Sequence, residues 1–363
     1  MPEYLRYRDD LEAIEPDEPE TFRKIIDVMT AGMHEVRRQA DRSIRISHAK
    51  AHAFLKGEIV VTDGLPPELA QGLFARPRSY AALVRLSQVP GEVLDDRKVS
   101  SPRGMSIKVF GVEGPKLPGH EGATQDFLLD TGGTVFPFAD AKQFLAGFAP
   151  NDVVAPLLPE AVKGVVSKVA RAANVALHAV GLNSPLLDAY GHPPEHPLSQ
   201  SYYSQAPLRY GDYVAKVGVV PATDALKAMQ GQKLDLKDEN GVRDAVIEFF
   251  RTNEARYDVR VQLAVDEKRT PIEDASVEWP EDVSPYRTVA QLVLPPQDAY
   301  DPARQEAVDV GMAFAPWHAL AAHRPLGSLM RARLAVYPVL SARRHRENGA
   351  AVAEPASLDA VPG

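Results

Sequence analysis

Short runs of β-forming residues, each closed by a glycine or proline turn, are the feature that most restricts how this chain can fold. From Ile44 onward the runs GEIVVTD, YAALVRLSQV and MSIKVFGVEG follow one another. Such runs are typical of successive antiparallel strands. LSQSYYSQAPLRYGDYVAKVGVVPA, YDVRVQLAVDE and YRTVAQLVLPPQ continue the pattern later in the chain. We therefore expect an antiparallel sheet assembled from distant parts of the sequence.

Helical stretches accompany this sheet. The segment from Thr21 to Ser43 repeats large apolar residues at helical spacing, and Thr21 can cap its first turn. The apolar stretch from Glu160 to Leu182 predicts a helix inserted between strands. NGVRDAVIEFFRTN predicts a short helix, and a C-terminal helix follows Leu326.

The division of the chain follows from these patterns. We expect residues 1–43 to form an N-terminal arm and helix, and 44–348 to form one large domain. Residues 349–363 read as a disordered tail. The predicted fold class is α+β.

Composition limits the classes of partner. The chain has 41 basic and 49 acidic residues and a formal charge of −8, so it has no overall positive electrostatic field to attract nucleic acid or anionic lipid. It has no cysteine, so any metal must be held by histidine, tyrosine or a carboxylate.

The N-terminus lacks a signal-peptide pattern, and no apolar run reaches the roughly 18 residues of a membrane span. We expect a small neutral or apolar partner, no nucleic acid, no stable membrane insertion and a cytoplasmic location, and leave open a homodimer or higher homo-oligomer.

The C-terminal helix places Arg333 one turn before Tyr337. Residues four apart on a helix share a face, so the guanidinium can donate to the phenolic oxygen and favour the phenolate. Tyrosine is among the few axial haem ligands open to a chain without cysteine. Pro338 removes a backbone donor and would loosen or kink the helix. Arginine and tyrosine at this spacing more often pack on a surface, so the pair alone leaves both interpretations open.

Three further pairs of polar residues are candidates for a functional site. His48 and His52 lie in RISHAKAHAF, at the expected start of the first strand, where both would point to one face. The ordinary interpretation is a histidine packed in a half-buried strand. LVRLSQVPGE places an arginine and a serine on one face of the next strand, and SPRGMSIKVF is a turn into another. His318 and His323 resemble a metal pair, but we expect a structural role for both.

Taken in order, these segments resemble the haem-binding core of the catalase superfamily. The order is R-x-x-H-A-K, V-R-x-S-x-V-x-G-E, P-R-G-x-x-x-K-x-[FY] and a late R-x-x-x-Y-P. The resemblance runs from about Arg45 to about Arg346, supported by SQSYYSQAPLRYGDYVAKV and AFAPWHALAAHRPLGSLMRARLAVYP. It implies an antiparallel β-barrel that holds haem b within residues 44–348. An N-terminal arm and surrounding helices would complete it, without a C-terminal flavodoxin-like domain.

On the proximal side, the resemblance implies that Tyr337 is the ligand of the haem iron and that Arg333 holds it ionised. Arg45 and Arg85 match arginines that pair with the haem propionates. Arg344 matches a further propionate arginine. A guanidinium can bind a carboxylate through two parallel hydrogen bonds, which suits this role.

On the distal side, His48 matches the histidine that takes a proton from the attacking peroxide oxygen and returns it to the leaving one. Ser87 matches the serine that orients this imidazole. A distal asparagine is expected within TQDFLLDTGGTVF, which contains none, so Asp130 and Thr131 are the candidates. Thr131 is the predicted catalytic residue, because its hydroxyl could donate one hydrogen bond whereas an ionised aspartate is costly in an apolar pocket unless it is paired. Which of the two faces the iron stays open. Ser47 precedes the distal histidine where a valine is usual.

These departures change the activity that the resemblance implies. Without the asparagine, efficient dismutation of hydrogen peroxide is not expected. A hydroxyl residue before the distal histidine is a feature of relatives of the allene oxide synthase type. We expect a haem-dependent peroxidase whose partner is a small organic or lipid hydroperoxide. The alternatives are a hydrogen peroxide-dismutating catalase, a fatty-acid hydroperoxide-transforming enzyme and a non-catalytic haem-binding protein.

Overall fold

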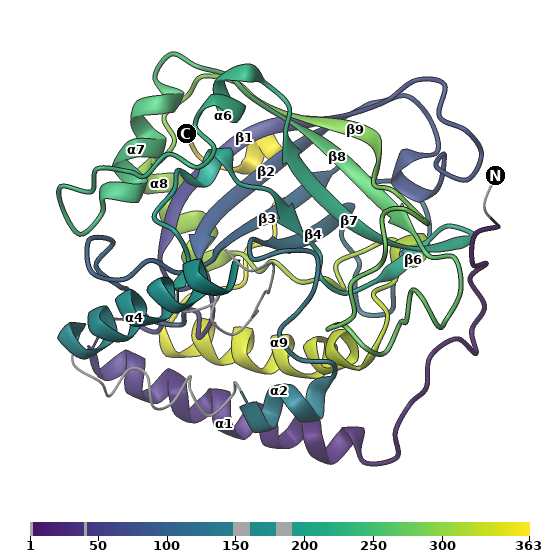
Figure 1. Ribbon diagram of the computed structural model, residues 1–363, viewed down its shortest axis with the longest axis horizontal. Coiled ribbons are helices and arrows are strands. Elements are labelled where there is room, and N and C mark those ends of the chain that lie inside the picture. The colour runs from purple at the N-terminus through teal and green to yellow at the C-terminus, as the bar shows by residue number, and fades with distance from the viewer. Residues whose placement is uncertain (1–2, 40–41, 148–159, 179–190) are drawn as a thin grey trace.

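Strands far apart in the sequence close into an antiparallel barrel in the computed structural model of the chain (Figure 1). The structure describes residues 3–39, 42–147, 160–178 and 191–363. The ring runs β1-β2-β3-β4-β5-β7-β8-β9 and returns to β1, because the short β5 pairs with both β4 and β7. The strands are β1 (Ala51–Val61), β2 (Ser79–Gln88), β3 (Arg103–Phe110), β4 (Thr124–Asp130), β5 (Tyr202–Tyr203), β6 (Leu208–Tyr210), β7 (Tyr213–Pro221), β8 (Ala255–Leu263) and β9 (Arg287–Leu294). The predicted antiparallel barrel is confirmed.

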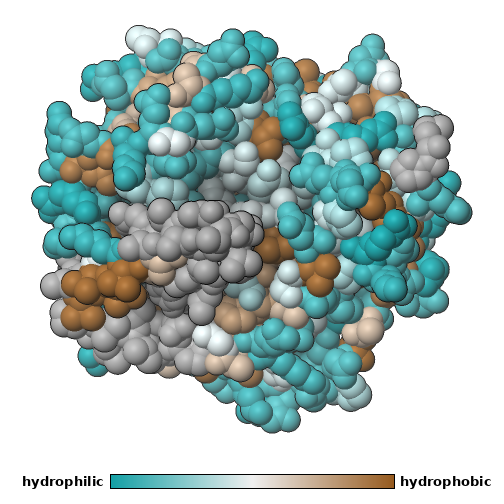
Figure 2. All heavy atoms as spheres, in the orientation of Figure 1, coloured by the Kyte–Doolittle hydropathy of each residue, from teal (hydrophilic) through white to brown (hydrophobic). Residues whose placement is uncertain are grey.

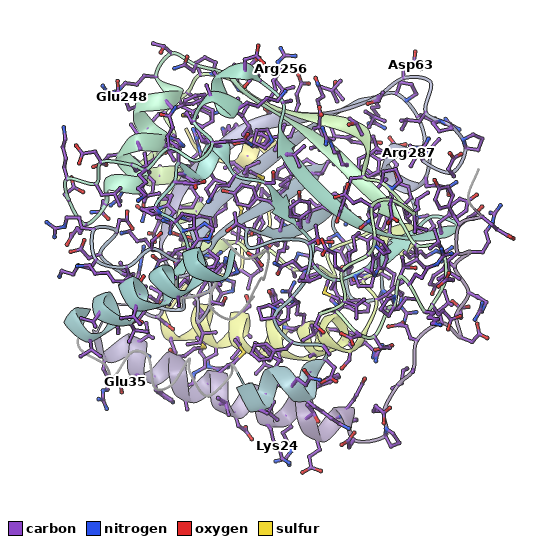
Figure 3. The ribbon with its side chains drawn as sticks, in the orientation of Figure 1. Lys24, Glu35, Asp63, Glu248, Arg256 and Arg287 are labelled. Atoms are coloured by element: carbon purple, nitrogen blue, oxygen red, sulfur yellow. The ribbon has the colours of Figure 1, made fainter. Side chains whose placement is uncertain are left out.

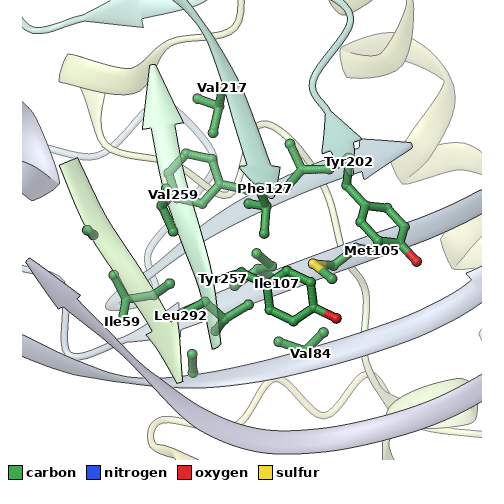
Figure 4. Packing of buried hydrophobic residues seen from close by; sticks show 14 of the residues in the cluster. Ile59, Val84, Met105, Ile107, Phe127, Tyr202, Val217, Tyr257, Val259 and Leu292 are labelled. Atoms are coloured by element: carbon green, nitrogen blue, oxygen red, sulfur yellow. The ribbon is translucent and has the colours of Figure 1, made fainter. Parts of the chain in front are cut away.

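Alternate residues of the ring strands fill the barrel. Figure 4 shows Met105 and Ile107 of β3 packed together with Tyr257 and Val259 of β8. Because successive side chains of a strand point to opposite faces, the residues between them face the helices and the loops outside. The buried Tyr257 satisfies its hydroxyl by donating to the Leu198 carbonyl at 2.8 Å. The interior is therefore a packed apolar core, and a ligand must bind outside it.

Helices α1, α2 and α9 lie together beside the barrel (Figure 1). Ile25 of α1 and Val336 of α9 belong to a second apolar core between these helices. α1 begins before the predicted N-cap Thr21, whose N–H already donates to the Asp17 carbonyl at 3.1 Å. The helices are α1 (Glu18–Gln39), α2 (Ala141–Gly147), α4 (Glu160–His178), α6 (Asp224–Ala228), α7 (Gly241–Phe250), α8 (Pro302–Glu306) and α9 (Ser328–Glu347). The predicted inserted helix is confirmed as α4, and residues 179–182 of that prediction lie outside the described residues.

An arginine on α9 ties the N-terminal arm to this helix. Arg331 Nε and Nη2 donate to the two oxygens of Glu18 at 2.9 and 2.6 Å. Its Nη1 donates to Glu12 Oε1 at 2.6 Å and to Glu273 Oε1 at 3.0 Å. Although burial opposes the charge, hydrogen bonds to Glu18 and Glu273 raise the pKa of Arg331 above its ordinary value. The network fixes α9, which carries the predicted site residues Arg333, Tyr337 and Arg344, against the arm.

Replacing Arg331 by glutamine should destabilise the fold, because three carboxylates would be left close together without their cation. Removing one partner of a largely buried ion network costs about 3–5 kcal/mol. The measurement is urea-induced unfolding of R331Q followed by circular dichroism. The matched control is R251Q, which removes an exposed arginine paired with Glu248. A free energy of unfolding within about 1 kcal/mol of the control's would contradict this role.

The C-terminal segment 349–363 packs on the barrel, which corrects the expectation of a disordered tail. Val361 is buried, and its carbonyl accepts a hydrogen bond from Lys56 Nζ at 2.6 Å. Glu354 forms an ion pair with the fully buried Lys108 at 3.2 Å. These partners belong to β1 and β3, so the local composition of the segment could not reveal them.

The face seen in Figure 2 is mainly hydrophilic, with a brown area at the left in the region that α4 occupies in Figure 1. α4 exposes several valines, namely Val162, Val165, Val166 and Val169. Within the part of the chain that the structure describes, no helix combines the length and apolar content that a membrane crossing requires.

Candidate active site

A cavity of about 700 Å³ lies between the barrel strands and the helices α1 and α9. Its volume falls within the roughly 300–1,000 Å³ typical of small-molecule sites. Much of the wall is apolar and includes Met29, Met33, Ile46, Leu128, Phe136 and Val336. A few polar side chains interrupt this wall, and most of the predicted site residues are among them.

His48 lines the cavity from the segment that precedes β1. The strand begins only at Ala51, which corrects the expectation that His48 lies within it. His48 has a φ of 58°, in the left-handed region that residues other than glycine rarely adopt. Its N–H donates to the Val89 carbonyl at 2.8 Å. A hydrogen-bonded bend, rather than strand alternation, therefore aims the imidazole, while His52 is fully buried in β1.

Two neighbours hold the imidazole in place. Ser87 Oγ on β2 lies 3.2 Å from His48 Nδ1. Gly104 on β3 leaves the space, since a Cβ there would lie 2.4 Å from the same nitrogen. Burial, reinforced by the positive charges of Arg85 and Arg333, lowers the pKa of His48 to about 3. The imidazole is therefore neutral near pH 7 and has a free lone pair for a proton.

Asp130, the last residue of β4, is the acid closest to this imidazole. Its Oδ1 lies 3.6 Å from His48 Nε2 and is buried without a hydrogen-bond partner. Burial raises the pKa of Asp130 to about 6, against the opposing effect of Arg333. Thr131 also lines the cavity, but its Oγ1 accepts a hydrogen bond from the Arg103 N–H at 2.9 Å. Asp130 thus lies next to the histidine, and the role of Thr131 stays a prediction, because a hydroxyl that accepts one hydrogen bond can still donate another.

Three arginines from distant parts of the chain, Arg45, Arg85 and Arg344, converge at the cavity wall. Arg45 Nη1 and Arg85 Nε donate to the same oxygen, Asp309 Oδ1, at 2.7 and 2.8 Å. Arg344 Nη1 donates to the Asp309 carbonyl. Asp309 lies in a π-helical turn, Ala307–Gly311. Such turns leave carbonyls free for other donors and are common at functional sites.

This arginine cluster carries more positive charge than Asp309 neutralises. Burial and the charge of Arg85 lower the pKa of Arg45 well below its ordinary value. Burial likewise lowers the pKa of Arg344 to about 10, although Asp309 acts in the opposite sense. Buried cations of this kind are stabilised when an anion bonds to them directly. The cluster therefore fits a ligand that carries carboxylates.

Tyr337 and Arg333 line the cavity from α9. The predicted helix is confirmed, and it continues through Pro338. The structure records no hydrogen bond between the Arg333 guanidinium and the Tyr337 oxygen, and none from either side chain to any other described residue. Both side chains are thus available to a ligand in the cavity.

A histidine outside the predicted set also reaches the cavity. His318, for which we expected a structural role, lines it and stacks on His120 with ring centroids 4.8 Å apart. His318 Nδ1 lies 3.4 Å from the buried Asp126. His323 is buried and accepts a hydrogen bond from the Leu73 N–H at 2.9 Å, which confirms its structural role. In the described ranges, no group of three or more His, Asp and Glu side chains is placed to hold a metal ion.

Comparison with known proteins identifies the fold. No family model and no curated protein sequence matches the chain. Among solved structures, a fungal catalase matches with a TM-score of 0.58 and 19% identity over 86% of this chain. Catalase A from Saccharomyces cerevisiae matches with a TM-score of 0.57 and 18% identity over 86%, and a bacterial catalase with 0.54 and 14% over 96%. The chain has the catalase fold.

The likeness to these catalases concerns the fold alone, since the identity is 14–19%. The chain spans 60%, 63% and 67% of the lengths of the fungal, yeast and bacterial catalases. The catalase-like architecture predicted from the order of the motifs is confirmed. Within this catalase fold, His48 and Asp130 line the cavity from the barrel side, with the buried Ser87 behind His48. Arg333 and Tyr337 line it from α9.

Proposed function

We propose that this catalase-fold chain is a haem-dependent peroxidase that acts on organic or lipid hydroperoxides. One observation carries the proposal. A single cavity combines the neutral His48, an available Tyr337 and three arginines, of which Arg85 and Arg344 are buried, whose positive charge exceeds the negative charge of Asp309 and Glu354. A proton acceptor, an oxygen ligand for iron and a site for carboxylates are what a haem peroxidase of this fold needs.

The residues present fit haem b. Arg45, Arg85 and Arg344 would bind the propionate carboxylates, which supply the negative charge that the cluster lacks. Tyr337 would be the iron ligand, a role that tyrosine can take. When bound, ferric haem would supply the redox centre at which the peroxide O–O bond is cleaved.

The chain's own residues would handle the proton of the peroxide. Neutral His48 would accept it at Nε2 and deliver it to the leaving oxygen. Ser87, 3.2 Å from Nδ1, would keep the imidazole oriented. The apolar wall would keep bulk water from intercepting the proton. An organic reductant would then supply the electrons that complete a peroxidase cycle.

The lining of the cavity supports an organic peroxide over hydrogen peroxide. Apolar residues such as Met29 and Phe136 can bury an alkyl group. Each Å² of apolar surface that is buried stabilises the bound state by about 25 cal/mol. Val166 lines the cavity and is also exposed on α4, so the apolar surface continues to the outside. Asp130, an acid rather than an amide, meets the histidine, which departs from the catalase pattern.

A hydrogen peroxide-dismutating catalase is the second candidate. The catalase fold and the contact between Ser87 and His48 favour it. A fatty-acid hydroperoxide-transforming enzyme would use the same apolar wall without an external reductant. A non-catalytic haem-binding protein would use the arginines and Tyr337 alone. The cytoplasmic location and the oligomeric state stay predictions.

The test is a stopped-flow comparison of hydrogen peroxide, cumene hydroperoxide and a fatty-acid hydroperoxide with the haem-loaded protein. We expect organic hydroperoxides to react at least about tenfold faster than hydrogen peroxide. A tenfold difference in rate requires only about 1.4 kcal/mol of additional stabilisation, which apolar contacts to the organic group can supply. An oxygen electrode should register no release of oxygen. Rapid oxygen release from hydrogen peroxide would establish the catalase alternative. A haem spectrum that no peroxide changes would establish the non-catalytic one.

A further inference from the structure

The cavity contains a second titratable group beside His48. The side chains of His48 and Asp130 are 23% and 18% exposed, and 3.6 Å separates Nε2 from Oδ1. Ser87 holds the other ring nitrogen, so the free side of the imidazole faces the acid. Oδ1 is buried without a partner. A buried polar atom without a partner is costly, so its retention here calls for a physical reason.

We propose that Asp130 is a catalytic acid–base residue that works with His48 as a pair, so that proton uptake from the peroxide requires the ionised carboxylate. This inference rests on the proposed peroxidase function and concerns the proton alone. His48 by itself is a weak base, because its pKa is only about 3. An adjacent carboxylate would compensate the charge of the imidazolium and make proton uptake far less costly.

The geometry allows both groups to touch one substrate atom. An oxygen atom can lie at hydrogen-bond distance, about 2.8 Å, from two groups that are this close together. Gly104 keeps the space open, because a Cβ there would lie 2.4 Å from His48 Nδ1 and 3.1 Å from Asp130 Oδ1. The peroxide's own proton would pass to the pair and then to the leaving oxygen, which departs in the alcohol ROH. The pair takes up one proton and then releases it, so the protonation state of the protein is the same before and after the exchange.

The groups that surround Asp130 determine the sign of the pH dependence. Besides His48, they are Arg333 from α9 and Tyr202 from β5. Arg333 favours the carboxylate, but burial acts more strongly and leaves the pKa of Asp130 at about 6. Burial raises the pKa of Tyr202, whose hydroxyl donates to the Pro197 carbonyl, so the phenol stays protonated. Below about pH 6 the pair is therefore neutral and inactive as a base, and above it the pair carries the negative charge that proton uptake needs.

The first experiment needs no haem. Infrared difference spectra of the apoprotein would be recorded against pH for the wild type, D130N and D63N. Asp63 lies at the periphery of the molecule (Figure 3), so D63N is a matched control. We expect the wild type and D63N to lose a protonated-carboxyl band with a midpoint near pH 6, and D130N to lack this transition. Spectra of D130N that match those of the wild type would overturn the inference.

The second experiment follows the rate constant for cumene hydroperoxide against pH with the haem-loaded proteins. For the wild type and D63N it should fall about tenfold per pH unit below the midpoint and level off above it. D130N and D130S should bind haem and show no such fall. A reaction whose pH profile is the same in D130N and in the wild type would overturn the role of Asp130 alone. A carboxyl transition without reaction at any pH would overturn the peroxidase function and, with it, this catalytic role.

Discussion

Replacing Tyr337 by phenylalanine should abolish stable haem binding under conditions in which the wild-type chain retains haem. Phenylalanine keeps the aromatic ring on α9 but removes the oxygen that would bind the iron. Loss of a partner that only orients a metal ligand lowers affinity about 10–100-fold, so loss of the ligand itself should cost at least about 100-fold. The measurement is titration of the apoprotein with haem, followed by visible absorbance.

Tyr80→Phe is the matched control, because Tyr80 lies half-buried on β2 and its ring contacts Arg78 rather than the cavity residues of α9. Y80F should bind haem as the wild type does. A dissociation constant for Y337F within about threefold of that for Y80F would exclude Tyr337 as the iron ligand.

Replacing His48 by glutamine should leave haem bound but slow the reaction with peroxide by about 10²–10⁴-fold. Glutamine can form hydrogen bonds in the same place, but it cannot accept a proton near neutral pH. The measurement is the second-order rate constant for cumene hydroperoxide in haem-loaded H48Q, above the midpoint for Asp130, where the wild-type rate is level.

The matched control is H34Q, in which an exposed histidine of α1 is replaced. A rate constant for H48Q within about tenfold of that for H34Q would show that His48 is not the proton acceptor. The two variants separate the two sides of the cavity. Y337F tests whether the cofactor is held, and H48Q tests whether the held cofactor reacts.

The strands were largely predictable, because alternating apolar residues between turns report burial on one face. β4 is the exception. Its run TQDFLLD contains the buried Gln125 and Asp126, which interrupt the pattern. Asp126 is tolerated because it stands opposite Lys108 on β3, whose Nζ donates to both of its oxygens at 2.9 Å. In the sequence, a charged residue that is buried against a partner on another strand cannot be distinguished from a charged residue on the surface.

The residues of the candidate site were predicted from the order of four motifs, and the structure brings all of them except the buried Ser87 to the wall of one cavity. His48, Arg85 and Tyr337 all line it. Which residue meets the histidine was not predictable. Asp130 and Thr131 are neighbours on the chain, and only the β3 pairing shows that the Arg103 N–H engages the threonine. Asp309 was missed because its role depends on arginines that are remote from it in sequence.

By itself, the sequence determined the antiparallel strands, the amphipathic helices and a set of arginine, histidine and tyrosine residues that line one cavity. Periodicity and residue chemistry are local properties, so they can be read along the chain. Only the tertiary structure decided the left-handed bend at His48, the counter-ion role of Asp309, the packed C-terminal segment and the approach of Asp130 to the imidazole. Each of these depends on contacts between distant segments, and the burial that results sets the charge states in the cavity.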